Sequence, residues 1–310
     1  MHVVFGTGGV GLAVVDTLVK RGLQVRVVNR SGSAEVPTGV EVVGGDASDP
    51  VFATQAGNGA TVIYQCLNPP YHMWPRLFPP LQRAVLAAAE AAEARLVTLE
   101  NLYMYRHQSP MPITEDTPEE PPTRKGRVRK QMSDELRRAH DQGRVRMVIG
   151  RASDYFGPRG EVMSPLGDRV VPRILEGKNV SVLGDPGLPH TYSYLPDVGS
   201  ALVILGERDE AIGQVWHLPN ADTVSTRELV EMMYEAAGTS GKVGKVPRPA
   251  LRMVSWFNPM VKETLEMLYE FDEPYVVDSS KFTDTFGETA TPLATAAEET
   301  VGWFRENVSA

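Results

Sequence analysis

A glycine-rich string near the start of the chain has the spacing of a phosphate-binding turn. The residues Gly6-Thr7-Gly8-Gly9-Val10-Gly11 match the pattern G-x-G-x-x-G, directly after the apolar run 3–5 and before a stretch of helical composition. In such a turn the first glycine permits a tight bend and the second lets the backbone approach a pyrophosphate. The third permits close packing of the helix, whose unpaired N–H groups attract phosphate. The string therefore predicts a dinucleotide-binding site, and a merely structural glycine turn is the alternative.

Residues about twenty positions further on indicate which dinucleotide is bound. An NAD site usually places an Asp or Glu there to accept a hydrogen bond from the ribose 2′-hydroxyl, whereas this chain has Asn29-Arg30-Ser31. With no carboxylate to repel a 2′-phosphate, and with the guanidinium of Arg30 as a planar donor, the sequence favours NADP. A solvated charge is the alternative for Arg30. Asp46 and Ala47 are further predicted cofactor contacts, although Asp46 could equally cap a turn.

Alternating strands and helices must position these residues. Short apolar runs alternate with helix-like stretches over the first 150 residues, which is typical of parallel βαβ units. The predicted strands cover 3–5, 25–28, 40–43, 61–64, 95–99 and 145–149, and the predicted helices cover 10–21, a short segment from Asp49-Pro50, 81–94 and 124–142. We therefore expect an α/β fold with a doubly wound parallel sheet, whose ligands bind beyond the carboxyl ends of the strands.

The second half of the chain differs in composition. After Gly150 it is punctuated by glycine and proline, with helices predicted near 197–206, 225–237 and 295–307. We expect an NADP-binding domain over 1–155 and a smaller, mainly substrate-binding domain over 156–310, some segments of which return to the first domain. The proline-rich stretch 109–123 is predicted to be a surface loop beside the site.

Bulk composition argues against several classes of protein. With 31 Lys and Arg against 39 Asp and Glu, the net charge of −8 disfavours a broad surface for nucleic acid or anionic lipid. No apolar run is long enough to span a membrane, and no export signal is visible. The single cysteine, Cys66, and the scattered spacing of six histidines predict no disulfide framework and no metal site. We expect a cytoplasmic protein whose partner is a small-molecule substrate.

Together with later motifs, these residues resemble the extended or atypical short-chain dehydrogenase/reductases, the NAD(P)-dependent epimerase/dehydratase family. The later motifs are 45–49 after the third strand, 112–118 before the long helix, 151–158 after the sixth strand, and 194–198. The resemblance covers nearly the whole chain. It implies a Rossmann fold with a smaller C-terminal substrate-binding domain and an oxidoreductase or epimerase reaction. The resemblance also implies a possible homodimer, in which the helices that begin near Leu81 and Arg124 could form the dimer face, as in that family.

Two departures from the resembled family concern its catalytic residues. Its active-site helix carries Tyr-x-x-x-Lys, and the aligned stretch here runs from Gly126 to Lys130, so that the lysine is retained and the tyrosine is not. Its fifth strand ends in a Ser or Thr that polarises the substrate oxygen, whereas Leu99-Glu100-Asn101 stands here. The usual proton relay must therefore be replaced if the chain is an enzyme.

Candidate replacements follow the fifth strand. Tyr103 is the preferred proton donor, because a tyrosine hydroxyl can donate to a carbonyl oxygen when a cation lowers its pKa. Lys130 is predicted to bind the nicotinamide ribose, and Asn101 is predicted to position substrate or water. The alternatives are a tyrosine that only packs, a solvated lysine and a strand-end Glu100 that pairs with a nearby arginine.

Substrate contacts are predicted where aromatic and polar groups coincide, as they do in small-molecule pockets. These predicted contacts are Tyr71, His72, Trp74, Glu100, Tyr105, His190 and Tyr192. The basic run 124–130 could contact a substrate phosphate, but such a run is usually a solvated helix face.

The sequence thus indicates an NADP-dependent oxidoreductase or epimerase-like enzyme that acts on a carbonyl or hydroxyl group of a small organic or sugar-like substrate. The missing tyrosine and serine keep a second hypothesis open, a non-catalytic sensor or regulatory protein that binds NADP(H) without turnover.

Overall fold

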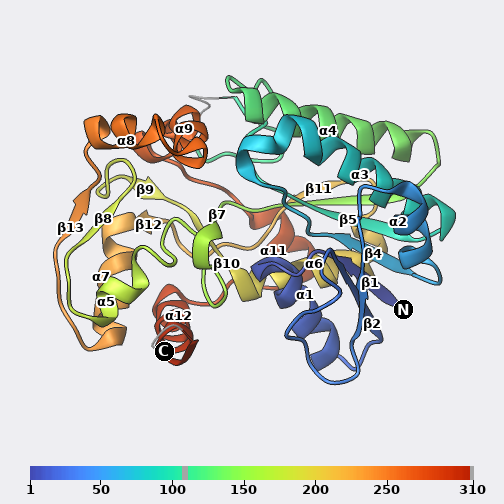
Figure 1. Cartoon of the computed structure of the whole chain (residues 1–310), viewed down its shortest axis with the longest axis horizontal. Helices are drawn as coiled ribbons and strands as arrows, with labels where there is room; N and C mark the ends of the chain where they lie inside the picture. The colour runs from blue at the N-terminus through green and yellow to red at the C-terminus, as the bar shows by residue number, and fades with distance from the viewer. Residues whose placement is uncertain (107–110, 308–310) are drawn as a thin grey trace. The chain divides into compact units, whose positions relative to one another are not determined.

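The computed structural model describes residues 1–106 and 111–307, and the chain divides into two compact units (Figure 1). Unit 1 comprises Met1–His107, Thr117–Ala152 and Val198–Leu218. Unit 2 comprises Gln108–Asp116, Ser153–Asp197 and Pro219–Ala310. The first residues of the predicted loop 109–123, residues 109 and 110, lie outside the described residues.

Unit 1 is built on a seven-stranded parallel sheet with the order β11-β6-β5-β4-β1-β2-β3. Its strands are β1 (His2–Phe5), β2 (Val25–Asn29), β3 (Glu41–Gly44), β4 (Val62–Gln65), β5 (Arg95–Glu100), β6 (Arg146–Arg151) and β11 (Val215–His217). The strand order reverses beside β1, and in open α/β sheets ligands generally bind beyond the carboxyl ends of the strands at such a reversal, here those of β1 and β4. The predicted doubly wound α/β fold is confirmed.

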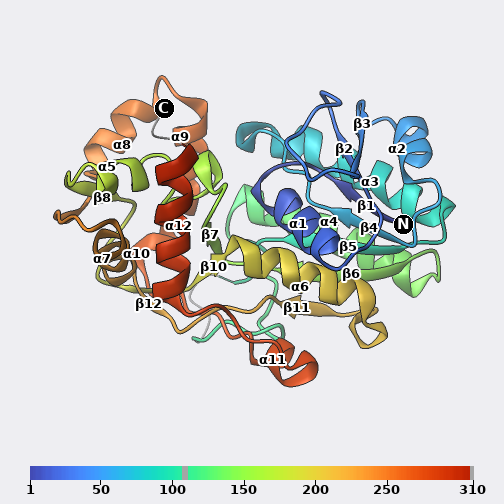
Figure 2. The same cartoon turned by 90° about the horizontal axis from the view of Figure 1, so that it is seen from below.

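Helices cover both faces of this sheet (Figures 1 and 2). The helices of unit 1 include α1 (Gly9–Lys20), α2 (Pro50–Gly57), α3 (Trp74–Ala91), α4 (Arg124–Asp141) and most of α6 (Leu195–Glu207). One face packs against α2, α3 and α4 through alternate strand residues such as Val3, Phe5 and Ile63. On the other face α6 crosses α1 closely, because a Cβ on Gly199 would lie 2.6 Å from Cβ of Ala13. As predicted, a short helix opens at Asp49-Pro50: α2 begins at Pro50, and Asp49 caps it by accepting from the N–H of Val51 at 2.9 Å.

Two features of unit 1 differ from the prediction. Helix α3 begins at Trp74 rather than at residue 81 and includes Pro79 and Pro80. Proline removes a helix hydrogen bond and is costly inside a helix, but the deep burial of Trp74 and Phe78 offsets that cost. Strand β11 was not predicted, because only its pairing with β6 distinguishes this short segment from a loop.

Unit 2 is assembled from short elements around its own apolar core. Its strands are β7 (Asp154–Phe156), β8 (Val180–Val182), β9 (Pro189–His190), β10 (Tyr192–Tyr194), β12 (Val224–Ser225) and β13 (Val243–Lys245), paired as β10-β7, β12-β9 and β13-β8. Its helices are α5 (Val171–Leu175), α7 (Thr226–Ala237), α8 (Arg248–Ser255), α9 (Pro259–Thr264), α10 (Tyr269–Asp272), α11 (Ser280–Phe286) and α12 (Leu293–Asn307). The core joins Phe156, Ile174, Met233 and Phe304.

Short 3-10 helices complete the description at Tyr71–Met73, Glu161–Met163, Asp209–Ala211 and Leu265–Met267. Within the described ranges, no helix has the length and apolar content that crossing a membrane requires.

Candidate active site

The glycine turn at the carboxyl end of β1 leaves room for a phosphate group. Gly6 has φ +108°, and a Cβ there would lie 2.8 Å from the carbonyl oxygen of Cys66. A Cβ on Gly11 would lie 2.0 Å from the carbonyl oxygen of Gly6, whereas one on Gly8 would meet no heavy atom within 4 Å. Gly8 is also the N-cap of α1 and supplies no capping side chain. The first and third glycines are thus required by packing, while the second faces open space beside a helix N-terminus that attracts anions.

The end of β2 is tied to this turn by Asn29. The Nδ2 of Asn29 donates to Oγ1 of Thr7 at 3.0 Å and to the carbonyl oxygen of Ser33 at 2.8 Å, and its Oδ1 accepts from the N–H of Gly32 at 2.8 Å. Ser31 also donates to Oδ1 of Asn29, at 3.3 Å. These bonds fix the backbone that carries Arg30, whose side chain is exposed.

Asp46 and Ala47 follow β3. The carboxylate of Asp46 accepts from the N–H and the hydroxyl of Ser48 at 2.9 and 2.7 Å. Those hydrogen bonds, and to a smaller extent the charge of Arg30, lower the pKa of Asp46. Asp46 therefore forms a local turn within electrostatic reach of Arg30, and Ala47 is buried beside it.

Aromatic side chains gather beyond β4 and β5 in what we call the aromatic cluster, which consists of Tyr71, Trp74, Phe78 and Tyr103. Successive rings of Tyr71, Trp74 and Phe78 meet edge to face, with centroids 4.9 and 5.2 Å apart. The centroid of Tyr103 lies 6.0 Å from that of Trp74, and the Tyr71 hydroxyl donates to the Tyr103 hydroxyl at 3.3 Å. Two of the predicted substrate contacts, Tyr71 and Trp74, and the predicted proton donor are thus brought together. His72, by contrast, is exposed.

Two cations of the basic run 124–130 face this cluster, so the expectation of a wholly solvated helix face is wrong. Lys125 is 0% and Arg129 2% exposed. The Nζ of Lys125 lies 4.4 Å from the ring centroid of Tyr71, and the guanidinium of Arg129 lies 4.6 Å from that of Phe78. Arg129 also donates to the carbonyl oxygen of Leu99 at 3.0 Å, near the carboxyl end of β5. Cation–π contact and this hydrogen bond compensate for the burial of the charges.

The residues aligned with the family's Tyr-x-x-x-Lys lie elsewhere on α4. Lys130 is 36% exposed and pairs with Asp134 at 2.8 Å. Gly126 is buried, and a Cβ on it would lie 2.2 Å from the carbonyl oxygen of Tyr103 and 2.6 Å from Cβ of Pro121. Position 126 therefore accepts no side chain without a shift of the backbone. Asn101 is half-buried, and its Oδ1 accepts from the N–H of Tyr103 at 3.4 Å.

Glu100 and Tyr105 belong to a buried polar network at the ends of β5 and β6. Arg151 is fully buried and contacts carboxylate oxygens of Glu100 at 3.1 Å and Glu119 at 2.8 Å, and its guanidinium lies 4.9 Å from the ring centroid of Tyr105. Burial lowers the pKa of Arg151, but the charge of Glu100 together with Tyr105 and Glu119 outweighs burial and holds the pKa above its ordinary value. The Tyr105 hydroxyl pairs with Nε2 of His217 at 2.7 Å.

The remaining acceptor of this network is Oε1 of Glu100, which has no hydrogen-bond partner among the residues described here. Glu100 is 1% exposed. A buried carboxylate oxygen with unused acceptor capacity at a strand end is suited to a ligand hydroxyl group.

His190 and Tyr192, both predicted substrate contacts, form a buried network of their own in unit 2. The Nε2 of His190 contacts Asp154 at 2.9 Å, and its ring stacks on Phe271 with centroids 5.0 Å apart. The Tyr192 hydroxyl pairs with Thr226 at 2.8 Å, and burial raises the pKa of Tyr192. Nearby Glu270 accepts from the Tyr275 hydroxyl at 3.1 Å, and burial raises the pKa of that carboxyl.

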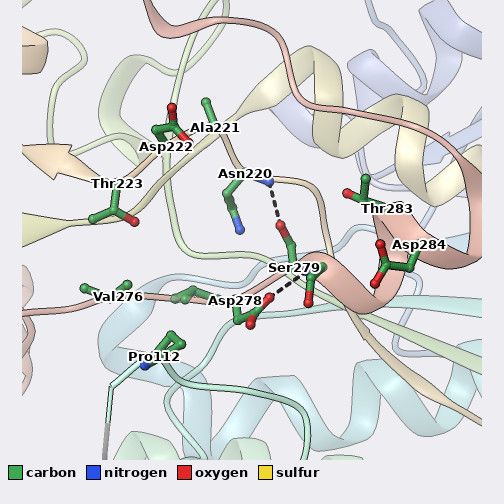
Figure 3. A pocket seen from close by; sticks show the side chains of 12 residues that line it. Pro112, Asn220, Ala221, Asp222, Thr223, Val276, Asp278, Ser279, Thr283 and Asp284 are labelled. Carbon is green, nitrogen blue, oxygen red and sulfur yellow. Dashed lines mark hydrogen bonds between the residues drawn. The ribbon is translucent and has the colours of Figure 1, made fainter.

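Unit 2 also contains a polar pocket of about 420 Å³ that the sequence did not indicate (Figure 3). Its lining residues include Asn220, Asp222, Thr223, Asp278 and Ser279. The N–H of Asn220 donates to Oγ of Ser279 at 3.1 Å, which joins two loops that are far apart in sequence. Such a pocket offers hydroxyl and carboxylate groups to a ligand. No group of three or more His, Cys, Asp or Glu within the described part of the chain is placed to hold a metal ion.

Lys125 and Arg129 are the residues that sequence reasoning missed. Both belong to the basic run 124–130, and a run of this kind is usually a solvated helix face, but these two side chains are almost fully buried. The available signal was the i, i+4 spacing of Lys125, Arg129 and Ser133, which share one helical face.

Comparison with known proteins supports this architecture. Residues 2–218 match the model of the NAD dependent epimerase/dehydratase family. No curated protein sequence matches the chain. Among solved structures, an epimerase of Methanothermobacter thermautotrophicus superposes with a TM-score of 0.81 at 18% identity, covering 99% of this chain and 92% of its own.

Two further solved structures cover the full length. The UDP-glucose 4-epimerase of Thermotoga maritima with UDP-glucose has a TM-score of 0.79 at 16% identity, covering 100% of both chains. The UDP-glucuronic acid 4-epimerase of Bacillus cereus, in complex with UDP-glucuronic acid and NAD, has a TM-score of 0.77 at 15% identity, covering 99% of each chain. At these identities the likeness is one of fold.

Proposed function

This chain belongs to the NAD-dependent epimerase/dehydratase family, and on that basis we propose that it is an NADP-dependent oxidoreductase or epimerase-like enzyme. Its substrate is a small organic or sugar-like molecule with a carbonyl or hydroxyl group at the reacting carbon. The sugar-like class is supported by similar structures that contain UDP-glucose or UDP-glucuronic acid.

The open space at Gly8 is the observation that carries the proposal. A Cβ would meet nothing within 4 Å there, although the neighbouring Gly6 and Gly11 are tightly packed. The backbone from Gly6 to Gly11 would hold the pyrophosphate, and Arg30 would pair with a 2′-phosphate. When bound, the dinucleotide supplies a hydride acceptor or donor at its nicotinamide ring. Glu100 and the aromatic cluster would orient the substrate.

Fluorescence titration with NADPH and NADH tests the first step. We expect NADPH to bind more tightly than NADH, and Arg30→Ala to weaken NADPH about 10- to 100-fold while leaving NADH unchanged, because a charge-assisted bond is lost. Arg21→Ala is the matched control, since Arg21 is a partly exposed arginine that pairs with Glu207. Failure of both dinucleotides to bind below millimolar concentration contradicts the proposal, and tighter binding of NADH contradicts the role of Arg30.

A second candidate, a non-catalytic NADP(H)-binding sensor, is favoured by the closed packing around Gly126. No tyrosine fits at that position, so the family's proton relay is absent in its usual form. A panel of ketones, aldehydes and nucleotide sugars separates the two candidates when NADPH oxidation and epimerised products are both measured. Binding without any product supports the sensor.

A further inference from the structure

We propose that this chain rebuilds the tyrosine–lysine proton-transfer unit from three separate segments, with Tyr103 as the proton donor, Tyr71 as its hydrogen-bond partner and Lys125 as the stabilising cation. The inference rests on the proposed function, because it supplies the proton for the same carbonyl or hydroxyl chemistry.

The helix geometry excludes the obvious pair. A side chain at position 126 collides with the backbone of Tyr103, and Lys130 pairs with Asp134 on a half-exposed face. One residue earlier, Lys125 and Arg129 repeat the same i, i+4 spacing on the buried face. Helix α4 therefore presents two cations to the aromatic cluster and no phenol.

The phenol comes instead from the loops beyond the strands. Tyr71 follows β4 and Tyr103 follows β5, and neighbouring parallel strands bring their carboxyl ends together. The Tyr71 hydroxyl donates to the Tyr103 oxygen at 3.3 Å. Such a bond favours the ionised form of Tyr103, because it stabilises charge on the oxygen that accepts it.

The positive charge comes from α4. Nζ of Lys125 lies 4.4 Å from the ring centroid of Tyr71, and both Lys125 and Arg129 are almost fully buried. In a medium of low dielectric constant, a unit positive charge over the ring face of Tyr71 favours negative charge within the hydrogen-bonded pair of Tyr71 and Tyr103. The bond from Arg129 to Leu99 at 3.0 Å and its contact with Phe78 hold α4 at the end of β5, so Arg129 is a positioning residue.

The proton transfer balances in either direction. When a hydride reaches the carbonyl carbon of the substrate, the π-bond electrons move to the carbonyl oxygen, which takes the proton of the Tyr103 hydroxyl and becomes an alcohol. The Tyr103 phenolate then takes the proton donated by Tyr71, and solvent returns a proton to Tyr71 while Lys125 stabilises the negative charge. In the oxidation of an alcohol, the Tyr103 phenolate accepts the hydroxyl proton.

Tyrosine ionisation in the cofactor-free protein tests the assembly directly. The ten tyrosines are labelled with ¹³C at Cζ and titrated by NMR, and the signals of Tyr71 and Tyr103 are assigned with Tyr71→Phe and Tyr103→Phe. We expect Lys125→Met to raise the ionisation midpoint of the pair by about one pH unit, the effect of removing a unit charge a few ångströms away. Lys130→Met is the control, because Lys130 is partly exposed and pairs with Asp134. This variant should leave the ionisation midpoint unchanged.

The opposite results overturn the inference. An unchanged midpoint in Lys125→Met, or an equal shift in Lys130→Met, removes Lys125 from the unit. If Lys125→Met does not fold, two other variants test the inference. Tyr71→Phe must raise the ionisation midpoint of Tyr103, and Lys125→Arg must leave that midpoint at its wild-type value. Failure of either result overturns the inference. NADPH titration of the same samples keeps the two proposals apart. A wild-type protein that does not bind NADPH contradicts the proposed function, whereas the ionisation midpoints test the tyrosine–lysine unit.

Turnover supplies a second readout once a substrate is found. Tyr103→Phe should then reduce the hydride-transfer rate about 100-fold or more with little change in NADPH affinity. Retained turnover in that variant removes Tyr103 as the proton donor.

Discussion

Gly126 shows how a single position constrains the chemistry of the site. A Cβ there would lie 2.2 Å from the Tyr103 carbonyl oxygen, and the contacting atom is backbone, which cannot rotate away. We predict that Gly126→Ala lowers the free energy of unfolding by roughly 2–3 kcal/mol, the cost of overpacking a rigid interior. Urea unfolding measures the change.

The matched control is Gly302→Ala in the middle of α12, where a Cβ meets nothing within 4 Å. That change should be neutral or stabilising by up to about 1 kcal/mol, because alanine is the better helix former. If the two variants are equally stable, the packing around Gly126 does not exclude a side chain.

The glycine turn allows folding and binding to be separated residue by residue. Gly8→Ala meets open space at φ −75°, so we predict little change in stability, within about 1 kcal/mol, but at least a tenfold loss of NADPH affinity because the methyl group occupies the phosphate position. Gly11→Ala should destabilise the fold itself, since its Cβ would lie 2.0 Å from the Gly6 carbonyl oxygen. Unfolding and NADPH titration are measured on both variants. Unimpaired NADPH binding by Gly8→Ala argues against a pyrophosphate at this turn.

At the scale of elements, Glu119 and Arg151 join the segment before α4 to β6. Glu119 contacts Arg151 at 2.8 Å and Arg137 through both carboxylate oxygens. Burial raises the pKa of Glu119, but the hydrogen bonds of Arg137 and the charge of Arg151 outweigh burial, and the net pKa lies below its ordinary value. A carboxyl group with a depressed folded-state pKa stabilises the protein above its unfolded pKa of about 4.3, and this contribution is lost as the pH falls through the folded-state value.

We therefore predict that Glu119→Gln lowers the free energy of unfolding by roughly 2–4 kcal/mol at neutral pH, because it removes one of the two carboxylates that pair with the buried Arg151. The deficit should shrink as the pH falls below the unfolded pKa of about 4.3, and it should vanish below the depressed folded-state pKa, where wild-type Glu119 is also neutral. Urea unfolding at several pH values measures both quantities. Glu41→Gln, at the exposed pair with Arg26, should cost less than about 1 kcal/mol at any pH. A pH-independent deficit in Glu119→Gln contradicts the electrostatic explanation.

Elements with a strong local pattern could be predicted from the sequence, and those that depend on tertiary packing could not. The central strands are buried on both faces and read as apolar runs. The start of α3 could not be predicted because Pro79 and Pro80 oppose a helix locally, and only the packing of Trp74 and Phe78 compensates. The burial of Arg129 on α4 could not be predicted, because its charge is stabilised by an aromatic ring of α3 that only tertiary packing brings near.

The same distinction applies to the candidate site. The glycine turn is a local motif within six residues, so its geometry could be inferred from the sequence alone. Tyr71, Tyr103 and Lys125 lie on three segments, and their proximity depends on the pairing of β4 with β5 and on the packing of α4. The polar pocket in unit 2 joins loops near residues 220 and 279, and no local pattern marks either loop.

At the scale of the whole molecule, the chain passes repeatedly between the two units. Unit 1 is formed by three segments, and α6 begins in unit 2 at Leu195 and continues in unit 1 from Val198. Unfolding of either unit therefore disrupts a helix that belongs to both. We expect the two units to unfold in one cooperative transition, although only unit 1 contains the glycine turn.

NADPH provides a way to measure this coupling. A ligand at about 100 times its dissociation constant stabilises the folded state by about 2.7 kcal/mol, which corresponds to a rise in melting temperature of roughly 5 °C for a chain of this size. Fluorotryptophan labelling reports on each unit by ¹⁹F NMR, because Trp74 and Trp216 lie in unit 1 and Trp256 and Trp303 lie in unit 2. We predict that NADPH raises the melting temperature of the buried Trp216 and of Trp303 equally. A rise for Trp216 alone would mean that the units unfold independently and that α6 does not couple them.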